Sequence, residues 1–138
     1  MSNKFKYISG YETLRALPVV SGAVIEIGDN LKISGGFVEA VAATTDNLAF
    51  IGVAKEAHRA TDPAGEITVS IANGMSIWES ELDAATDIVV GDVLQLNGAQ
   101  KLKKSATDAV ALAMESKLGA TKIRHLFKIP VTVLGDLV

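Results

Sequence analysis

Two stretches decide the fold of this sequence, and they read GDNLKISGG (Gly28–Gly36) and GDVLQLNGAQ (Gly91–Gln100). Each opens on Gly-Asp, a pair typical of a tight turn. Each continues with alternating apolar and polar residues, which is the period of a half-buried strand. Each then reaches a second glycine-containing turn, and Asn97-Gly98 is the strongest short signal for a β-hairpin. Both stretches therefore predict hairpins.

The likeness of the two stretches continues beyond their turns. Each is followed by a polar strand with lysine or glutamate, and then by Thr-Thr-Asp up to Asp46 or Ala-Thr-Asp up to Asp108. An apolar run ending at Glu56 or Glu115 comes next. We interpret this as an internal repeat near residues 23–71 and 88–129. The alternative is that Gly-Asp-x-Leu is a common turn sequence and the match is chance.

The rest of the chain is also typical of strands and turns. The fold class that we predict is mainly β, a small β-barrel or β-sandwich built from two related hairpin-rich halves, which form one domain over residues 21–138. Closing the halves into one barrel would hide most sheet edges. The strands are expected at residues 23–27, 31–33, 37–41, 47–54, 66–71, 75–79, 88–90, 93–96 and, around Pro130, at 122–134.

Thr107–Leu118 is compatible with two structures. The segment is rich in alanine, has possible capping residues and stops before Gly119, so local rules allow a helix. The matching part of the first copy, around Phe50–Val53, favours a strand. We therefore predict a strand over Ala109–Glu115.

Residues 1–20 differ from the rest and are either an N-terminal arm or a first edge strand. As an arm, they could add a strand to the sheet edge of a neighbouring molecule. On that hypothesis, removing about the first fifteen residues would weaken binding and leave the fold intact.

Size and composition exclude several classes of protein. The chain has 138 residues and no cysteine, so it has no disulfide and no thiolate metal site. Its net charge of −3 argues against broad nucleic-acid binding, which needs basic patches. Its longest apolar stretches are too short to span a membrane, and its N-terminus has no apolar signal core.

No constellation of catalytic residues is visible. His58 and His125 lie in unlike contexts without a third ligand at a recognisable spacing. Asp29 and Asp92 occupy matching places in the repeat, where a paired-carboxylate site is conceivable, but capping of their own turns is the better interpretation. We predict no enzyme activity, no cofactor and no metal.

The candidate contact residues are aromatic or basic. The single tryptophan, Trp78, is either core or a binding hot spot. The basic cluster near residue 101 either protects a strand edge or meets an acidic partner. The full set of candidate contacts is Phe5, Tyr7, Tyr11, Arg15, Trp78, Lys101, Lys103 and Lys104.

Over Ser21–Ile129 the sequence resembles the capsid-decoration, or cement, proteins of tailed bacteriophages. The resemblance rests on turns and small residues rather than on a chemical signature. Besides the first Gly-Asp-x-Leu, the matching segments are IGVAKEA (Ile51–Ala57), GEITV (Gly65–Val69), GDVL (Gly91–Leu94) and ATDAVALAMES (Ala106–Ser116).

The resemblance implies a structural protein of the virion, made in the host cytoplasm, that binds the major capsid protein on the outside of the head and stabilises the expanded shell. Such proteins often self-associate, commonly as trimers, although a dimer or monomer is possible. It implies no contact with nucleic acid or membrane. The alternatives are another head-fibre or tail component of a phage, and a small β-clip-like module that binds a ligand.

Overall fold

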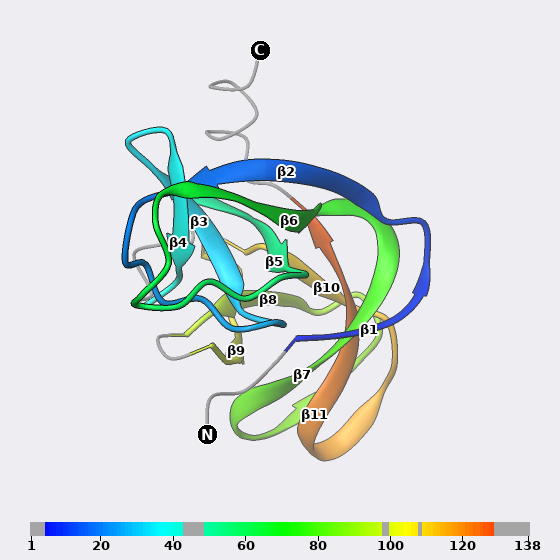
Figure 1. Cartoon of the computed structure of the whole chain (residues 1–138). Coiled ribbons are helices and arrows are strands. Elements are labelled where there is room, and N and C mark those ends of the chain that lie inside the picture. Colours follow the sequence, from blue (N-terminus) through cyan, green and yellow to red (C-terminus); the bar gives the residue numbers. More distant parts are fainter. Residues whose placement is uncertain (1–4, 43–48, 98–99, 108, 129–138) are drawn as a thin grey trace.

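The computed structural model describes residues 5–42, 49–97, 100–107 and 109–128. The described part is built from β-strands joined by turns (Figure 1). The strands are β1 (Lys6–Gly10), β2 (Thr13–Val19), β3 (Asn30–Ser34), β4 (Phe37–Ala40), β5 (Phe50–Ala54), β6 (Gly65–Ile71), β7 (Asn73–Ile88), β8 (Val93–Leu96), β9 (Leu102–Lys104), β10 (Ala111–Ala113) and β11 (Lys117–Lys128).

These strands form two units with the same topology. The first is a five-stranded sheet with the order β2-β6-β5-β3-β4. The second has the order β7-β11-β10-β8-β9, with β1 added outside β7. Adding five to each strand number in the order of the first unit gives the order of the second unit. The repeat is therefore real at the level of strand pairing.

The two units also share their main-chain hydrogen bonds around the Gly-Asp turns. In the first unit, with the donor N–H before the acceptor carbonyl, these bonds are Gly28–Ala54, Asp29–Glu26, Ala54–Asp29, Val41–Asn30 and Ala72–Ile51. Their counterparts in the second unit, in the same order, are Gly91–Ala113, Asp92–Val89, Ala113–Asp92, Ser105–Val93 and Lys128–Val110. Because hydrogen bonds define register, these pairs show which residues of the two units are equivalent.

Each half pairs with a strand that precedes it rather than with the other half. The sequence suggested that the two halves close together into one barrel or sandwich, but β6 pairs with β2, and β11 pairs with the long β7. In the second unit, Leu82 of β7 also pairs with Leu102 of β9, which closes that sheet into a five-stranded barrel. The repeat therefore extends N-terminally to β2 and β7, whose sequences show no resemblance.

Residues 6–19 are two edge strands of this fold. β1 pairs with β7 and β2 pairs with β6, and the ring of Phe5 is buried in the core. Removing the first fifteen residues would therefore take away β1, part of β2 and a core side chain. It is not expected to leave the fold intact, contrary to the arm hypothesis.

Some local expectations differ from the structure. Residues 23–27 form one isolated bridge, between Ile25 and His58, rather than a strand. The helix that local rules allow over Thr107–Leu118 is absent from its described residues, where β10 is a three-residue strand. Asn73 and Gly74, which lie between two expected strands, are the first residues of β7. Asp46, Gly98, Asp108 and residues 130–138, which include Pro130, lie outside the described residues.

The core has two parts, and the larger one joins the units. A smaller cluster, which includes Leu31, Ile51 and Val69, fills the first unit. The larger cluster fills the second barrel and also takes in side chains of the first unit. Those four side chains, which we call the junction residues, are Val41, Phe50, Val53 and Ala72.

Candidate interaction surfaces

Three of the aromatic candidates build the junction between the units. Phe5 is 2% exposed and its ring stacks on Phe127 with 5.1 Å between centroids. Trp78 is 3% exposed, which confirms the core interpretation, and Tyr7 packs edge-on against it at 5.6 Å. Phe5 and Trp78 are therefore not available as surface contacts within this fold.

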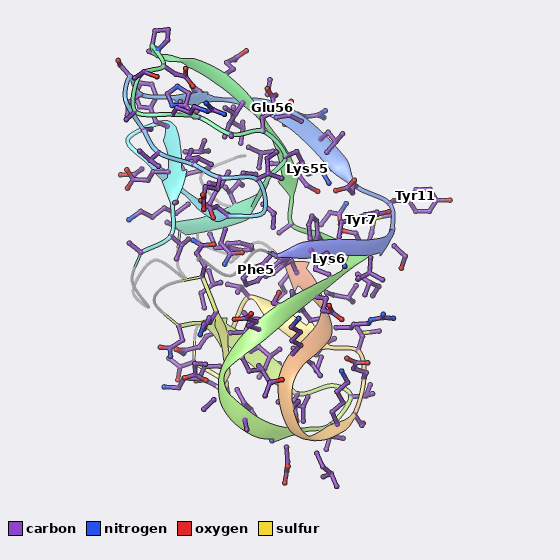
Figure 2. The ribbon with its side chains drawn as sticks, turned by 60° about the horizontal axis from the view of Figure 1, so that its bottom comes forward. Phe5, Lys6, Tyr7, Tyr11, Lys55 and Glu56 are labelled. Carbon is purple, nitrogen blue, oxygen red and sulfur yellow. The ribbon has the colours of Figure 1, made fainter. Side chains whose placement is uncertain are left out.

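Lys55 ties the first unit to these aromatic rings. Its Nζ lies 5.3 Å from the ring centroid of Tyr7 and 5.6 Å from that of Trp78, which is cation–π geometry. The same Nζ is 3.0 Å from Oε1 of Glu12. A cavity of about 410 Å³ borders this group, and Figure 2 shows Lys55 on the side of the first unit that faces β1. Nothing in the residue pattern signals this role of Lys55.

The other candidates from the N-terminal segment face outward. Tyr11 is 79% exposed and points away from the molecule between β1 and β2 (Figure 2). Its neighbour Met75 is 59% exposed, and the N–H of Tyr11 donates to the carbonyl of Met75. Arg15 is exposed on β2. Of the eight candidates, Tyr11 and Arg15 remain accessible at this edge.

The basic cluster lies on and beside β9, which is not a free edge. β9 pairs with β8 on one side and with β7 on the other. Lys101 lies 3.8 Å from Glu81 and Lys104 lies 3.1 Å from Asp92, while Lys103 is exposed. The structure thus contradicts the protected-edge interpretation, and two of the three charges have acidic neighbours within the chain.

The two aspartates of the repeat cap their turns. Oδ2 of Asp29 accepts from the N–H of Glu26 at 2.8 Å, and Oδ2 of Asp92 accepts from the N–H of Val89 at 2.9 Å. The Val89 N–H, with Lys104 nearby, lowers the pKa of Asp92. Both carboxylates hold backbone in place, as the turn interpretation predicted.

His125 forms a buried pair with a serine inside the second barrel. Its Nε2 lies 2.6 Å from Oγ of Ser80, and both residues are buried. Burial lowers the pKa of His125 to about 3, so the ring is neutral at physiological pH. No described carboxylate bonds to this pair, and neither side chain reaches a surface. The contact therefore satisfies a polar group within the core.

The burial of His125 predicts a pH dependence of stability. In the unfolded chain the ring takes up a proton near pH 6.5, whereas in the folded chain it resists protonation down to about pH 3. The unfolded state therefore binds more protons as pH falls, and stability decreases. The stability advantage of wild type over His125→Gln should shrink by roughly 2 kcal/mol between about pH 7.5 and about pH 5, measured by urea unfolding. An advantage that does not change with pH would contradict this.

The pKa of His58 is shifted in the opposite direction from that of His125. Its Nδ1 lies 2.6 Å from the carbonyl oxygen of Ala23 and its Nε2 lies 2.9 Å from that of Pro63. These two acceptors raise the pKa of His58, because only the protonated ring can donate to both. Its stabilising effect is complete below the ordinary histidine pKa and is lost as pH rises through the raised value.

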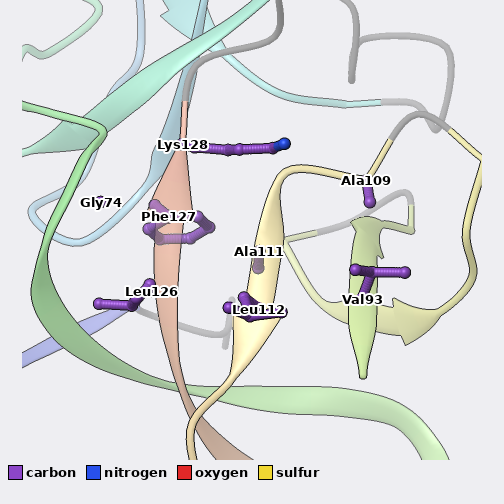
Figure 3. Close-up of a pocket in the computed structure, with 8 residues that line it drawn as sticks. All are labelled: Gly74, Val93, Ala109, Ala111, Leu112, Leu126, Phe127 and Lys128. Carbon is purple, nitrogen blue, oxygen red and sulfur yellow. The ribbon is translucent and has the colours of Figure 1, made fainter. Parts of the chain in front are cut away.

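An apolar row crosses the outer face of the second barrel. Val93, Leu112, Leu126 and Ile77 lie in register on β8, β10, β11 and β7. Val93 and Leu112 are each 37% exposed. Beside the row is a hollow of about 190 Å³, shown in Figure 3 and lined by Gly74, Val93, Ala109, Ala111, Leu112, Leu126, Phe127 and Lys128.

The apolar row is absent from the contacts that the sequence predicts. The alternation Ala111-Leu112-Ala113 carries a usable signal, because a leucine between two small residues of a strand must face the opposite side from them. The pattern alone does not say which side is the core.

Two kinds of site are not found in the described part of the chain. No three of its His, Asp or Glu side chains are grouped so that they could hold a metal ion. None of its residues belongs to a helix long and apolar enough to cross a membrane.

The chain is similar in fold to a solved phage structure, although no protein-family model and no curated protein matches it. That structure is the crystal structure of the N base of the head fibre gp8.5 of bacteriophage phi29, with a TM-score of 0.54 over 84% of this chain and 95% of that chain. This chain folds like a phage head-fibre base. The sequence identity is 16%, so the likeness lies in the fold.

Proposed function

We propose that this protein is a structural component of the head of a tailed bacteriophage and binds the outer surface of the capsid. The observation that carries the proposal is the likeness in fold to the phi29 head-fibre base, which covers 84% of this chain and 95% of that chain. The resemblance of the Gly-Asp repeat to cement proteins, which rests on turns and small residues, agrees with the same class.

The physical properties of the surface suit such a role. The two units are joined by a continuous apolar core, so a contact made by one unit is held rigidly relative to contacts made by the other. Many copies on a regular shell convert modest individual contacts into a large combined stabilisation. Exposed apolar side chains occur on both units, including Phe37 on the first and Leu112 on the second.

The test mixes the purified chain with expanded heads assembled from the major capsid protein encoded in the same genome. We expect saturable binding at a fixed number of copies per head, measured by co-sedimentation, and protection of the heads against heat. Heads that bind none of the chain, under conditions where they remain intact, would refute the proposal.

A second candidate, the base of a head fibre, is favoured by the likeness to the phi29 protein, which is itself a head-fibre base. The same experiment separates the two functions. A cement protein should raise the temperature at which heads rupture, because it links neighbouring capsid subunits. A fibre base should bind at fixed positions with no change in rupture temperature, and electron microscopy would show a projecting fibre when the remaining fibre protein is added.

A further inference from the structure

The contact between the two units uses one face of the first unit. The junction residues Val41, Phe50, Val53 and Ala72 are at most 5% exposed and pack into the core of the second barrel. The ring of Phe50 lies 4.9 Å from that of Phe127. Gln100 adds a polar link, because its Nε2 donates to the carbonyl of Val41 at 2.8 Å.

The repeat places four equivalent residues on the second unit. The matched hydrogen bonds pair Val41 with Ser105 and Ala72 with Lys128. They also pair Ile51 with Val110, so that Phe50 matches Ala109. Val53 matches Leu112, because the first lies opposite Asn30 and the second opposite Val93. The equivalents of the four junction residues are therefore Ser105, Ala109, Leu112 and Lys128.

Three of these equivalents lie around the hollow. Ala109, Leu112 and Lys128 all line it. Val53 is 1% exposed, whereas its equivalent Leu112 is 37% exposed. The face that the first unit buries within the chain is therefore open on the second unit, where apolar side chains and Lys128 line the hollow.

This asymmetry shows that the internal contact is of the head-to-tail kind. In a contact related by a twofold axis, both equivalent faces would be covered. Here the face of the first unit is covered by the second unit, and the equivalent face of the second unit is open. The surface of the second unit that covers the first therefore also has an equivalent on the first unit, and that equivalent covers nothing within the chain. This equivalent surface is the end of the first unit that contains Ile71. Ile71 is equivalent to Phe127, because the two lie opposite the equivalent residues Gly52 and Ala111, and Ile71 is only partly buried.

The occupant of the hollow must supply bulk. Ala109 replaces Phe50, which leaves a recess where the first unit has a projecting ring. In the matched β3–β4 and β8–β9 hairpins, Gly36 is equivalent to Gln100. Phe37 follows Gly36 in the chain. Phe37 is 40% exposed on a hairpin that projects from the first unit (Figure 1). Within one molecule, Gln100 contacts the first unit. In a second copy, the ring of Phe37 therefore lies beside Gly36, the residue equivalent to Gln100.

We infer that the hollow is a self-association site, which receives the end of the first unit of a second copy with Phe37 at the contact. The interface repeats between molecules the arrangement that joins the two units within one molecule. Because it is head-to-tail, it builds rings or filaments rather than an isolated twofold dimer. The inference does not depend on the proposed capsid role.

The test uses two variants that each remove one side of the contact. Leu112→Glu places a charge in the hollow, and Phe37→Asp removes the ring from the hairpin. Each variant alone should sediment as a monomer under conditions where wild type is associated. Mixed together, they should form a dimer, because one molecule keeps an intact hollow and the other keeps an intact hairpin. Analytical ultracentrifugation measures all three states.

Controls keep the test decisive. Leu118→Glu adds the same charge at a residue that is 88% exposed and does not line the hollow, so it should associate like wild type. Val93→Glu is a second variant of the hollow in case Leu112→Glu is not folded by circular dichroism. A monomeric wild type at the highest soluble concentration, or a mixture that stays monomeric, overturns the inference.

Discussion

Phe127→Ala is expected to lower the free energy of unfolding by about 3–5 kcal/mol. The ring of Phe127 is 2% exposed and has four aromatic neighbours. Its centroid lies 5.1 Å from that of Phe5, 4.9 Å from that of Phe50, 4.5 Å from that of His125 and 6.2 Å from that of Trp78. Removing it leaves a cavity at the point where β1, the first unit and the second barrel meet.

Urea unfolding followed by tryptophan fluorescence measures this loss, because Trp78 is the single tryptophan and belongs to the same cluster. The matched control is Tyr11→Ala, which removes an aromatic ring that is 79% exposed and should change stability by less than about 0.5 kcal/mol. If both variants lose similar free energy, Phe127 is not the centre of the junction.

Gly52→Ala is expected to cost about 3 kcal/mol, because the added methyl group has no room. A Cβ atom on Gly52 would lie 2.1 Å from the carbonyl oxygen of Ser70 and 3.1 Å from Cα of Ile71. Both atoms belong to the backbone of β6, so β5 and β6 would have to separate. The second unit carries Ala111 at the matching position, so this close approach is particular to the first unit.

Gly65→Ala is the control for this substitution. Gly65 begins β6, and a Cβ atom added there would meet no other atom within 4 Å, so the change should be within about 0.5 kcal/mol of wild type. Thermal unfolding by circular dichroism compares the three proteins. A Gly52→Ala variant as stable as Gly65→Ala would show that β5 and β6 lie further apart than the structure places them.

The hairpins were predictable because their causes are local. Gly28-Asp29 and Gly91-Asp92 specify their turns through backbone freedom and a carboxylate that caps its own loop, and both features lie within a few residues. The strands that follow alternate with period two, which is also a local property. For the same reason the repeat was visible in the chain, although only from its Gly-Asp turns onward.

The candidate contacts were less predictable because exposure is not a local property. Phe5 and Trp78 have the residue types of binding hot spots, but a distant partner, Phe127, covers both. Leu112 and Val93 look like core residues and are partly exposed. Alternation says that neighbouring side chains point to opposite faces, and it does not say which face meets another sheet.

By itself, the sequence determined that this protein is made of β-strands, where its tight turns lie, and that one hairpin-rich pattern occurs twice. The tertiary structure alone decided that each half pairs with the strand before it, that β1 and Phe5 complete the core, and that one unit buries the face which the other leaves open. Turns and alternation arise between residues close in the chain, whereas strand partners and burial depend on contacts between residues far apart.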